Sequence, residues 1–314
     1  MRRDGDRSPC WRRTLSDVRI AVTGSHGLIG TALLARLRAE GHVPVPLVRS
    51  APGAGEIGWD PRAGRLDPEA LSGIDAVVNL AGAGIGDKRW TDDYKREVLE
   101  SRTGATTLIA ESMASLDDGP RTLLSGSAIG FYGDRGDEEL DERSAAGEGF
   151  LTEVVEAWEA STASAERAGI RVLHLRTGIV LAPKGGALGK MLPLFKLGLG
   201  GRFGSGKQWM SWISLDDEVG AIVHLLTSGA AGPVNLTAPA PARNAELADT
   251  IGDVLHRPTI VPVPAFGPKL VLGGERAGAL LFESQRVLPT KLLADGYRFV
   301  HPTLVEALRA VLRR

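Results

Sequence analysis

The chain has 314 residues, of which 43% are hydrophobic and 24% charged, and its formal net charge is −1. This length and composition predict one large α/β domain with a smaller appended lobe. A charge near zero provides no field that would attract a nucleic acid, so we expect no such partner. No apolar run reaches the roughly 18 residues of a membrane-spanning helix, and we expect a cytoplasmic protein.

Residues 1–17 carry five arginines and lack the apolar run of a signal peptide. We therefore expect a flexible tail, with an amphipathic targeting segment as the alternative. The one cysteine, Cys10, lies in this tail and has no partner for a disulfide, which fits a reducing compartment. Neither this cysteine nor the six histidines show metal-ligand spacing, so we expect no metal site.

The first expected strand is an apolar run at 18–23 that leads into a glycine-rich turn, as a buried parallel strand does. A helix follows the turn and ends near Gly41, which suits the left-handed position after a helix. The next strand, at 43–48, contains Pro44 and Pro46. Because these prolines are two residues apart, both missing N–H donors face the same neighbour, and the other edge of the strand can still pair.

Strands and helices continue to alternate along the chain. Further strands are expected at 75–82, 121–125, 171–176 and 233–237. Further helices are expected at 91–114, 149–168, 191–197, 216–226, 244–255 and 303–312. This alternation predicts an α/β fold, a Rossmann-type doubly wound parallel sheet with a small C-terminal, mostly helical lobe. The dinucleotide-binding domain is expected at 18–182 and 213–237, and the smaller lobe at 183–212 and 238–314.

The turn at 24–30 is the strongest functional signal. Its glycines at 24, 27 and 30 let the chain turn tightly, approach a pyrophosphate closely and pack the helix against the strand. The start of the following helix then offers free N–H groups to the phosphates. We therefore expect a bound dinucleotide, and the alternative is a structural turn that has lost its ligand. The residues expected at the cofactor are Gly24, His26, Gly27, Leu28, Ile29, Gly30, Arg49, Leu80, Ala81 and Gly82.

The end of the second strand decides between the two nicotinamide dinucleotides, because an acidic residue there would hold the ribose hydroxyls of NAD(H). Arg49 stands at this place, followed by Ser50. A guanidinium cannot accept a hydrogen bond from a ribose hydroxyl, but it can pair with a 2′-phosphate. We therefore expect NADP(H) as the preferred cofactor, with NAD(H) as the alternative. Without a functional role, Arg49 would be a solvated side chain at a strand end.

Several segments together resemble one known family. They are 23–30, 79–82, 125–127 ahead of 131–133, and 212–217. These segments are similar to the extended short-chain dehydrogenase/reductases of the epimerase/dehydratase branch. An atypical subgroup of that branch has an epimerase-like body and a C-terminal domain of unknown function, and some of its members are described as cell-division inhibitors. The segments that resemble this subgroup are 88–90, 100–102, 149–151 with 158–159, 204–212 and 284–289, and the resemblance covers about 18–312.

The chain departs from the superfamily at its catalytic pair. Active members use a tyrosine followed four residues later by a lysine, which lowers the pKa of the tyrosine for proton transfer. The residues four places after the three tyrosines of this chain are Val98, Gly136 and His301. The resemblance places Ser127 at the position of the catalytic serine. Glu142, in the loop 137–143, and Tyr132 are the other candidate acid–base residues, and the alternatives are a solvated acidic loop and a packed aromatic side chain.

The substrate pocket is expected between Ser127, the turn at Gly82 and Ala83, and the segment 208–212. In that segment Gln208, Trp209 and Trp212 combine apolar faces with hydrogen-bonding groups, as small-molecule pockets do. The alternative for the segment is an ordinary core contact between the two lobes.

These patterns predict an NADP(H)-binding, epimerase- or reductase-like enzyme that acts on an unidentified small molecule. Lys88 and Lys184 are further candidate proton donors. The missing tyrosine–lysine pair favours an alternative function, a non-catalytic sensor or regulatory protein that binds the dinucleotide. A third possible function, the regulation of cell division, is supported only by the description of some members of the subgroup as cell-division inhibitors. The sequence leaves the oligomeric state open.

Overall fold

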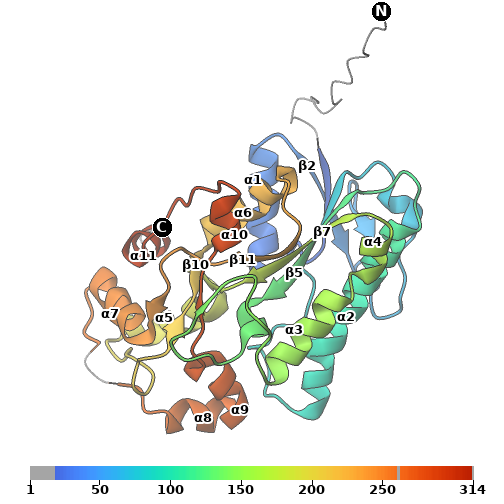
Figure 1. Cartoon of the computed structure of the whole chain (residues 1–314). Coiled ribbons are helices and arrows are strands. Elements are labelled where there is room, and N and C mark those ends of the chain that lie inside the picture. Colours follow the sequence, from blue (N-terminus) through green and yellow to red (C-terminus); the bar gives the residue numbers. More distant parts are fainter. Residues whose placement is uncertain (1–17, 260–261, 313–314) are drawn as a thin grey trace, which may run out of the picture.

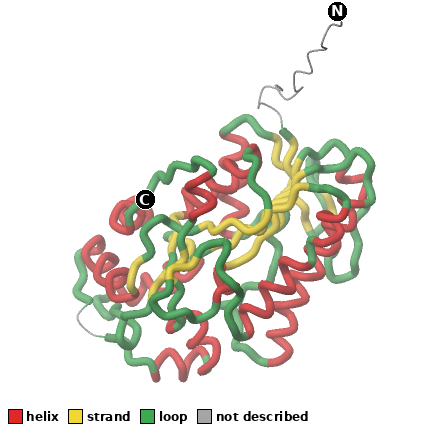
Figure 2. Tube along the Cα trace, in the orientation of Figure 1, coloured by secondary structure: helices red, strands yellow, loops and turns green. Residues whose placement is uncertain are grey.

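Figure 1 shows the computed structural model of the chain, which describes residues 18–259 and 262–312. The N-terminal segment 1–17, with Cys10 and the expected flexible tail, lies outside the described residues. Strands gather in the middle of the molecule and helices surround them, as the tube in Figure 2 shows. The chain therefore forms a layered α/β structure.

Seven parallel strands form the central sheet, in the order β11-β7-β5-β4-β1-β2-β3. The strands are β1 (Arg19–Val22), β2 (Val43–Val48), β3 (Ile57–Gly58), β4 (Ala76–Asn79), β5 (Thr122–Ala128), β7 (Arg171–Thr177) and β11 (Gly232–Leu236). Because β1 pairs with both β2 and β4, the chain winds outward to β3 and then returns to build the other half. Doubly wound sheets bind ligands at this reversal, beyond the carboxyl ends of the strands. The predicted Rossmann-type fold is confirmed.

Side chains of the strands alternate between two apolar layers. Ile20 and Val22 of β1 lie in the core that is covered by α1 (Leu28–Ala39) and α6 (Leu215–Thr227). Ala21 faces the opposite layer, which is covered by α2 (Asp92–Ala114) and α4 (Ala163–Arg167). Figure 1 shows the two groups of helices on opposite sides of the sheet. Both faces of the sheet are therefore buried, as is usual for a parallel sheet.

The two prolines of β2 leave its pairing with β1 intact. The N–H of Val43 donates to the carbonyl of Val18 at 2.9 Å, so every second N–H group from Val43 onward faces β1. Pro44 and Pro46 therefore face the other side, where β3 pairs with residues 47–48. The missing donors point the same way, in agreement with the expectation from their spacing.

One expected helix is divided into two. We predicted a single helix at 149–168, and the structure has α3 (Phe150–Ala160) followed by α4. Between them the hydroxyl of Thr162 donates to the carbonyl of Glu159 and lies 3.0 Å from Nε2 of His174. Hydrogen bonds from such side chains compete with the helical backbone bonds, and this competition favours the turn.

The smaller lobe has an apolar core of its own around Trp212. Its main helices are α5 (Gly186–Lys196), α7 (Asn244–Leu255) and α11 (Leu304–Leu312). α5 begins five residues before the expected helix at 191–197. Its start at Gly186 follows Gly185, and glycines are poor helix formers, so the sequence pattern favoured a loop there. The two-stranded pair of β8 (Ile179–Leu181) and β10 (Trp212–Ser214) connects this lobe to the sheet.

The remaining elements are short. They are β6 (Glu139–Leu140), β9 (Trp209–Met210), β12 (Ala242–Arg243), β13 (Arg286–Val287), α8 (Phe266–Leu272), α9 (Gly274–Ala277), α10 (Thr290–Ala294) and the non-α turns at Pro68–Leu71, Ile129–Tyr132 and Gly278–Phe282. In the described ranges 18–259 and 262–312, no helix combines the length and apolarity needed to cross a membrane.

The C-terminal segment returns to the large domain. Leu292, on α10, is fully buried in the core beneath α6, and Figure 1 shows α10 beside α6. The hydroxyl of Tyr297 donates to the carbonyl of Asp217 at 3.1 Å. Part of the stretch 238–314, which we expected in the smaller lobe, thus packs against the Rossmann domain.

Candidate cofactor site

The glycine turn after β1 has no room for larger residues. Gly24 has a φ of +62°, and a Cβ at this residue would lie 2.6 Å from the carbonyl oxygen of Leu80. A Cβ at Gly30 would lie 2.2 Å from the carbonyl oxygen of Gly24. The first helical N–H groups of α1, which begins after Gly27, have no side-chain cap, and free N–H groups at a helix start favour an anion. The turn therefore has the shape and the polarity of a pyrophosphate site.

A buried chain of polar side chains holds this turn to the neighbouring strand. The hydroxyl of Thr23 donates to Oδ1 of Asn79 at 2.6 Å and accepts from the N–H groups of Leu80 and Ala81. Asn79 in turn donates to the hydroxyl of Thr106 on α2 at 2.9 Å. Thr23, Asn79 and Thr106 are all fully buried, so this network fixes the ends of β1 and β4 relative to each other.

A cleft of about 1070 Å³ opens above the turn. It gathers most of the residues predicted for the cofactor, together with Ala83 from the predicted substrate pocket. The predicted residues that line it are Gly24, His26, Gly27, Arg49, Leu80, Ala81, Gly82 and Ala83. Leu28, Ile29 and Gly30 follow directly as the first turn of α1. The cleft lies at the carboxyl ends of β1, β2 and β4, where the topology predicts a ligand.

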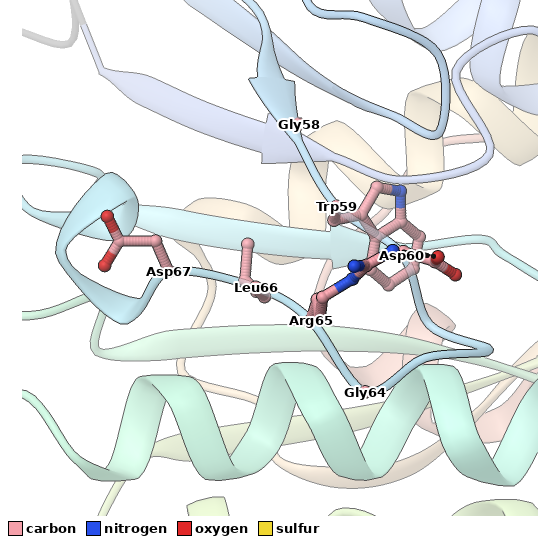
Figure 3. Close-up of a pocket in the computed structure, with 7 residues that line it drawn as sticks. All are labelled: Gly58, Trp59, Asp60, Gly64, Arg65, Leu66 and Asp67. Carbon is pink, nitrogen blue, oxygen red and sulfur yellow. Dashed lines mark hydrogen bonds and ion pairs between the residues drawn. The ribbon is translucent and has the colours of Figure 1, made fainter.

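One end of the cleft is formed by β2 and the segment after β3. Arg49 is exposed and follows the last residue of β2, and Trp59, Pro61 and Arg62 line the same cleft. Figure 3 shows Trp59 at the start of a tight hairpin that passes above a helix. In Rossmann folds this half, beyond the second strand, receives the adenosine of a dinucleotide.

Next to Gly82, which lines the cleft, lies a cation that the sequence patterns did not assign. Arg102, on α2, contacts Gly82, since a Cβ there would lie 3.3 Å from the guanidinium carbon. Its Nη1 donates to the carbonyl of Val98 at 2.9 Å, and the guanidinium lies 5.1 Å from the ring centroid of Trp158. Burial lowers the pKa of Arg102 to about 10. A partly buried cation next to the cleft provides a place for an anionic group of a ligand.

Ser127 lies outside the cleft residues and is bound to a charged pair. Its hydroxyl donates to Oε1 of Glu159 at 2.6 Å, and Arg176 binds both oxygens of Glu159 at 2.8 Å. Burial alone would raise the pKa of Glu159, but the Arg176 guanidinium holds it below its usual value. A carboxylate with a lowered pKa is a weak base. The arrangement therefore favours a structural role for Ser127 and Glu159 over a role in proton transfer.

Tyr132 belongs to the same buried network. Its side chain is fully buried, its hydroxyl donates to Oδ1 of Asn235 at 2.7 Å and it accepts from Arg176 at 3.2 Å. Burial raises the pKa of Tyr132. The structure thus places this candidate acid–base residue in the interior as a packed aromatic side chain, the alternative that we stated for it.

Glu142 binds backbone amides. Its carboxylate accepts hydrogen bonds from the N–H of Asn235 at 3.0 Å and from the N–H of Lys291 at 3.2 Å. These contacts join β11 to the start of α10. The loop with Glu142 is therefore a structural joint between the sheet and the C-terminal segment, away from the residues that line the cleft.

The predicted substrate segment is also placed apart from the cleft. Trp212 is fully buried in the core of the smaller lobe, so it lines no open pocket. Gln208 donates to the carbonyls of Phe203 and Leu281 and joins two parts of that lobe.

Trp209 is partly exposed. Its indole N–H donates to Asp137 at 3.0 Å, and the guanidinium groups of Arg243 and Arg286 lie 4.0 and 4.7 Å from the centre of its ring. The contacts of the segment 208–212 thus fit the alternative to a substrate pocket, which is a core contact between the two lobes.

The two candidate lysines differ in position. Lys88 lines the cleft and forms an ion pair with Glu97 at 3.0 Å, whereas Lys184 is exposed before α5. Among the described residues, no group of three or more histidine, cysteine or acidic side chains is placed to hold a metal ion.

The parallel sheet, the glycine turn at its point of reversal and the cleft above it define a Rossmann-type dinucleotide-binding protein. A family model described as the NAD dependent epimerase/dehydratase family matches residues 20–237, and one described as a domain of unknown function (DUF1731) matches residues 263–311. The chain belongs to the NAD-dependent epimerase/dehydratase family.

Curated relatives match over nearly the full chain. The epimerase family protein Mb2239 of Mycobacterium bovis is 44% identical over 291 residues, which cover 92% of this chain and 96% of the relative. The human epimerase family protein SDR39U1 is 38% identical and is matched over 94% of this chain and all of its own length, 100%.

Two solved structures illustrate the likeness in three dimensions. A crystal structure of human SDR39U1 (isoform 2) with NADPH has a TM-score of 0.85 and 36% identity, and it covers 94% of this chain and 99% of its own. The UDP-glucose 4-epimerase of Thermus thermophilus in complex with NAD has a TM-score of 0.72 and 19% identity, with 94% and 98% covered. At that identity the second likeness shows the fold alone.

Proposed function

We propose that this chain binds NADP(H) in the cleft above the glycine turn and acts on a small molecule as an epimerase- or reductase-like enzyme of atypical mechanism. The observation that carries the proposal is Arg49, which follows β2 in the cleft at the place where an NAD(H)-specific site has an acidic residue. The human relative that was crystallised with NADPH supports the same cofactor.

The residues of the cleft fit a dinucleotide. Any Cβ at Gly24 or Gly30 would collide with backbone, so the turn keeps the close approach that a pyrophosphate needs. In the proposal the N–H groups at the start of α1 bind the pyrophosphate, Arg49 binds the 2′-phosphate, and Arg102 neutralises negative charge near Gly82. When bound, the dinucleotide supplies the capacity to accept or donate a hydride.

A second function, a non-catalytic dinucleotide sensor, is favoured by one observation. Ser127, at the position of the family's catalytic serine, donates its hydroxyl to Glu159, and Tyr132 is buried in the same network. Neither side chain lines the cleft. A protein that holds the cofactor without turning it over needs no proton relay at this place.

Titration with NADPH and NADH tests the cofactor. Trp59 lines the cleft, so its fluorescence reports binding. We expect NADPH to bind more tightly than NADH, and Arg49→Ala to weaken NADPH by about tenfold or more, since a charge-assisted hydrogen bond contributes about 1.5–3 kcal/mol. Arg38→Ala, which removes an exposed arginine of α1 away from the cleft, is the matched control. Equal affinities for both nucleotides in the unmodified chain would refute the role of Arg49.

A second experiment separates the enzyme from the sensor. The NADPH complex is incubated with panels of carbonyl compounds and nucleotide sugars, and transfer of deuterium from the labelled nicotinamide is followed by mass spectrometry. Transfer to any member supports the enzyme and identifies the substrate class. Tight NADPH binding with no transfer across the panels favours the sensor.

A further inference from the structure

Arg62 lines the same cleft as Arg49. Arg62 extends from the hairpin after β3, and its side chain is 80% exposed. Its contact with Glu97 is long, with 3.6 Å between Nη2 and Oε1. An exposed pair at this distance contributes little, so the guanidinium is available to a ligand that enters the cleft.

The backbone of Arg62 is held in place by Asp60. In the hairpin the N–H of Asp60 donates to the carbonyl of Arg65 at 2.7 Å, and the N–H of Arg65 donates back at 2.9 Å. Oδ1 of Asp60 accepts from the N–H groups of Arg62 and Ala63 at 3.1 and 3.2 Å, and its other oxygen pairs with the Arg65 side chain at 3.1 Å. The hydrogen bonds from Ala63 and Arg65 hold the pKa of the Asp60 carboxyl below its usual value.

Figure 3 shows this hairpin with the Asp60 and Arg65 side chains close together and a helix below. The hairpin starts at Trp59, which is buried and donates its N–H to the carbonyl of Val48 at 3.0 Å. Since Arg49 follows Val48, this backbone hydrogen bond links the residue before Arg49 to the start of the hairpin that carries Arg62. On the other side the carbonyl of Pro61 lies against Gly104 of α2. The hairpin therefore lies against both β2 and α2.

We propose that Arg49 and Arg62 together form a two-arginine site for a phosphate monoester on the adenosine ribose, with Asp60 as the residue that positions Arg62. This inference rests on the proposed function and identifies how the site distinguishes NADP(H) from NAD(H). A phosphate monoester carries a charge of about −1.5 to −2 and three acceptor oxygens. Two guanidinium groups match both its charge and its acceptors, which one group alone does not.

Two small nucleotides test this site without any substrate. Adenosine 2′,5′-bisphosphate carries the ribose phosphate and adenosine 5′-monophosphate lacks it, and both are titrated calorimetrically against the full chain. We expect Arg62→Ala and Arg49→Ala each to weaken the bisphosphate by about tenfold, because each removes one charged hydrogen-bonding partner. The monophosphate should change by less than about twofold. Arg38→Ala again controls for the loss of one exposed positive charge.

Variants of Asp60 test positioning separately. Asp60→Ala removes the acceptor of the two hairpin N–H groups and should weaken the bisphosphate although Arg62 is still present. Asp60→Asn keeps a carbonyl oxygen at this place and should restore most of the affinity. A merely structural role would change the affinities for both nucleotides alike.

The outcomes distinguish this inference from the proposed function. If Arg49→Ala weakens the bisphosphate and Arg62→Ala does not, the two-arginine site is refuted while the proposed NADP(H) binding stands. Equal weakening of both nucleotides by Arg62→Ala would also refute it, because Arg62 would then bind another group. If the unmodified chain binds neither NADPH nor the bisphosphate, the proposed function fails as well.

Discussion

The hydroxyl of Ser127 is 2.6 Å from the carboxylate of Glu159, which in turn binds Arg176 through both oxygens. This contact ties Ser127 to a buried ion pair between β7 and α3. The hydroxyl of Ser127 is thus held by a buried ion pair whose two charges already satisfy each other.

Replacing Glu159 should therefore lower the stability of the fold and leave the affinity for the cofactor nearly unchanged. Glu159→Gln leaves the buried Arg176 cation without its carboxylate, and loss of one partner of a buried pair costs about 3–5 kcal/mol. We expect a clear fall in the thermal midpoint with the NADPH affinity of the folded protein nearly unchanged. Glu156→Gln, an exposed position on the same helix, is the control. A variant with an unchanged midpoint would contradict this account of the network.

Glu218 should make stability depend on pH. It is fully buried on α6, accepts from the hydroxyl of Thr177 at 2.8 Å and has a second oxygen without a partner. Burial raises the pKa of Glu218 to about 8, from an ordinary value of 4.5. Between these values the unfolded chain has lost the proton that the folded chain keeps. The free energy of unfolding should therefore fall as pH rises through this window, by up to about 1.4 kcal/mol per pH unit.

Denaturant unfolding at pH 5, 7 and 9, values chosen within and just above this range, measures the effect. Glu218→Gln has no proton to lose, so its advantage over the unmodified chain should grow with pH and level off above about 8. Other groups titrate equally in both proteins, and the difference isolates Glu218. A constant difference across the three conditions would show that Glu218 does not titrate in this window.

Arg276 should hold one wall of the cleft. It is 9% exposed on α9 and donates to the carbonyls of Lys88 and Gly86, in a loop whose Lys88 and Asp87 line the cleft. We expect Arg276→Gln to loosen this loop, to expose the chain after Lys88 to trypsin and to weaken NADPH. Limited proteolysis with mass spectrometry measures the cut.

The neighbouring Glu275 provides the control for Arg276. It forms an exposed ion pair with Lys95, and Glu275→Gln should leave the loop resistant to trypsin. Equal cleavage of both variants would show that general loosening of α9, and not the two carbonyl contacts, determines the effect.

Gly30→Ala should abolish NADPH binding or prevent folding of the turn, because its Cβ would lie 2.2 Å from the carbonyl oxygen of Gly24. Gly267→Ala is the matched control, since this helical glycine of α8 has open space where its Cβ would stand. Circular dichroism checks folding and fluorescence titration checks binding. Normal NADPH affinity of Gly30→Ala would exclude the close packing of turn and helix.

Local patterns were sufficient for the turn and for every strand of the central sheet except β3. The run at 18–23 and the glycines after it depend on near neighbours in sequence, and the structure has them as β1 and the start of α1. The division of α3 from α4 was missed, because it depends on His174, a residue of β7 that the pattern at 149–168 does not contain. Periodicity describes a segment by itself and carries no information about such partners.

The backbone of the candidate site and Arg49 were predictable from the sequence, but Arg102 was not. In the sequence Arg102 is one of several arginines on a polar helix. Its contacts with Trp158 and Gly82, which belong to other elements, distinguish it only in the folded chain. Trp212 is the opposite case, a residue that the sequence pattern assigned to the site and the structure places elsewhere. Its spacing from Trp209 suggested a pocket, but long-range packing buries it in the core of the smaller lobe.

The return of Leu292 to the core beneath α6 has a consequence for how this protein is made. A ribosome completes the whole of 20–237 before the segment with Leu292 emerges, so the apolar patch beside α6 that this segment covers stays exposed until then. The same patch would be exposed in a fragment that stops at the end of the matched family region. Separating the two family regions for expression should therefore yield an aggregating fragment, and co-expressing them as two pieces should restore a soluble pair.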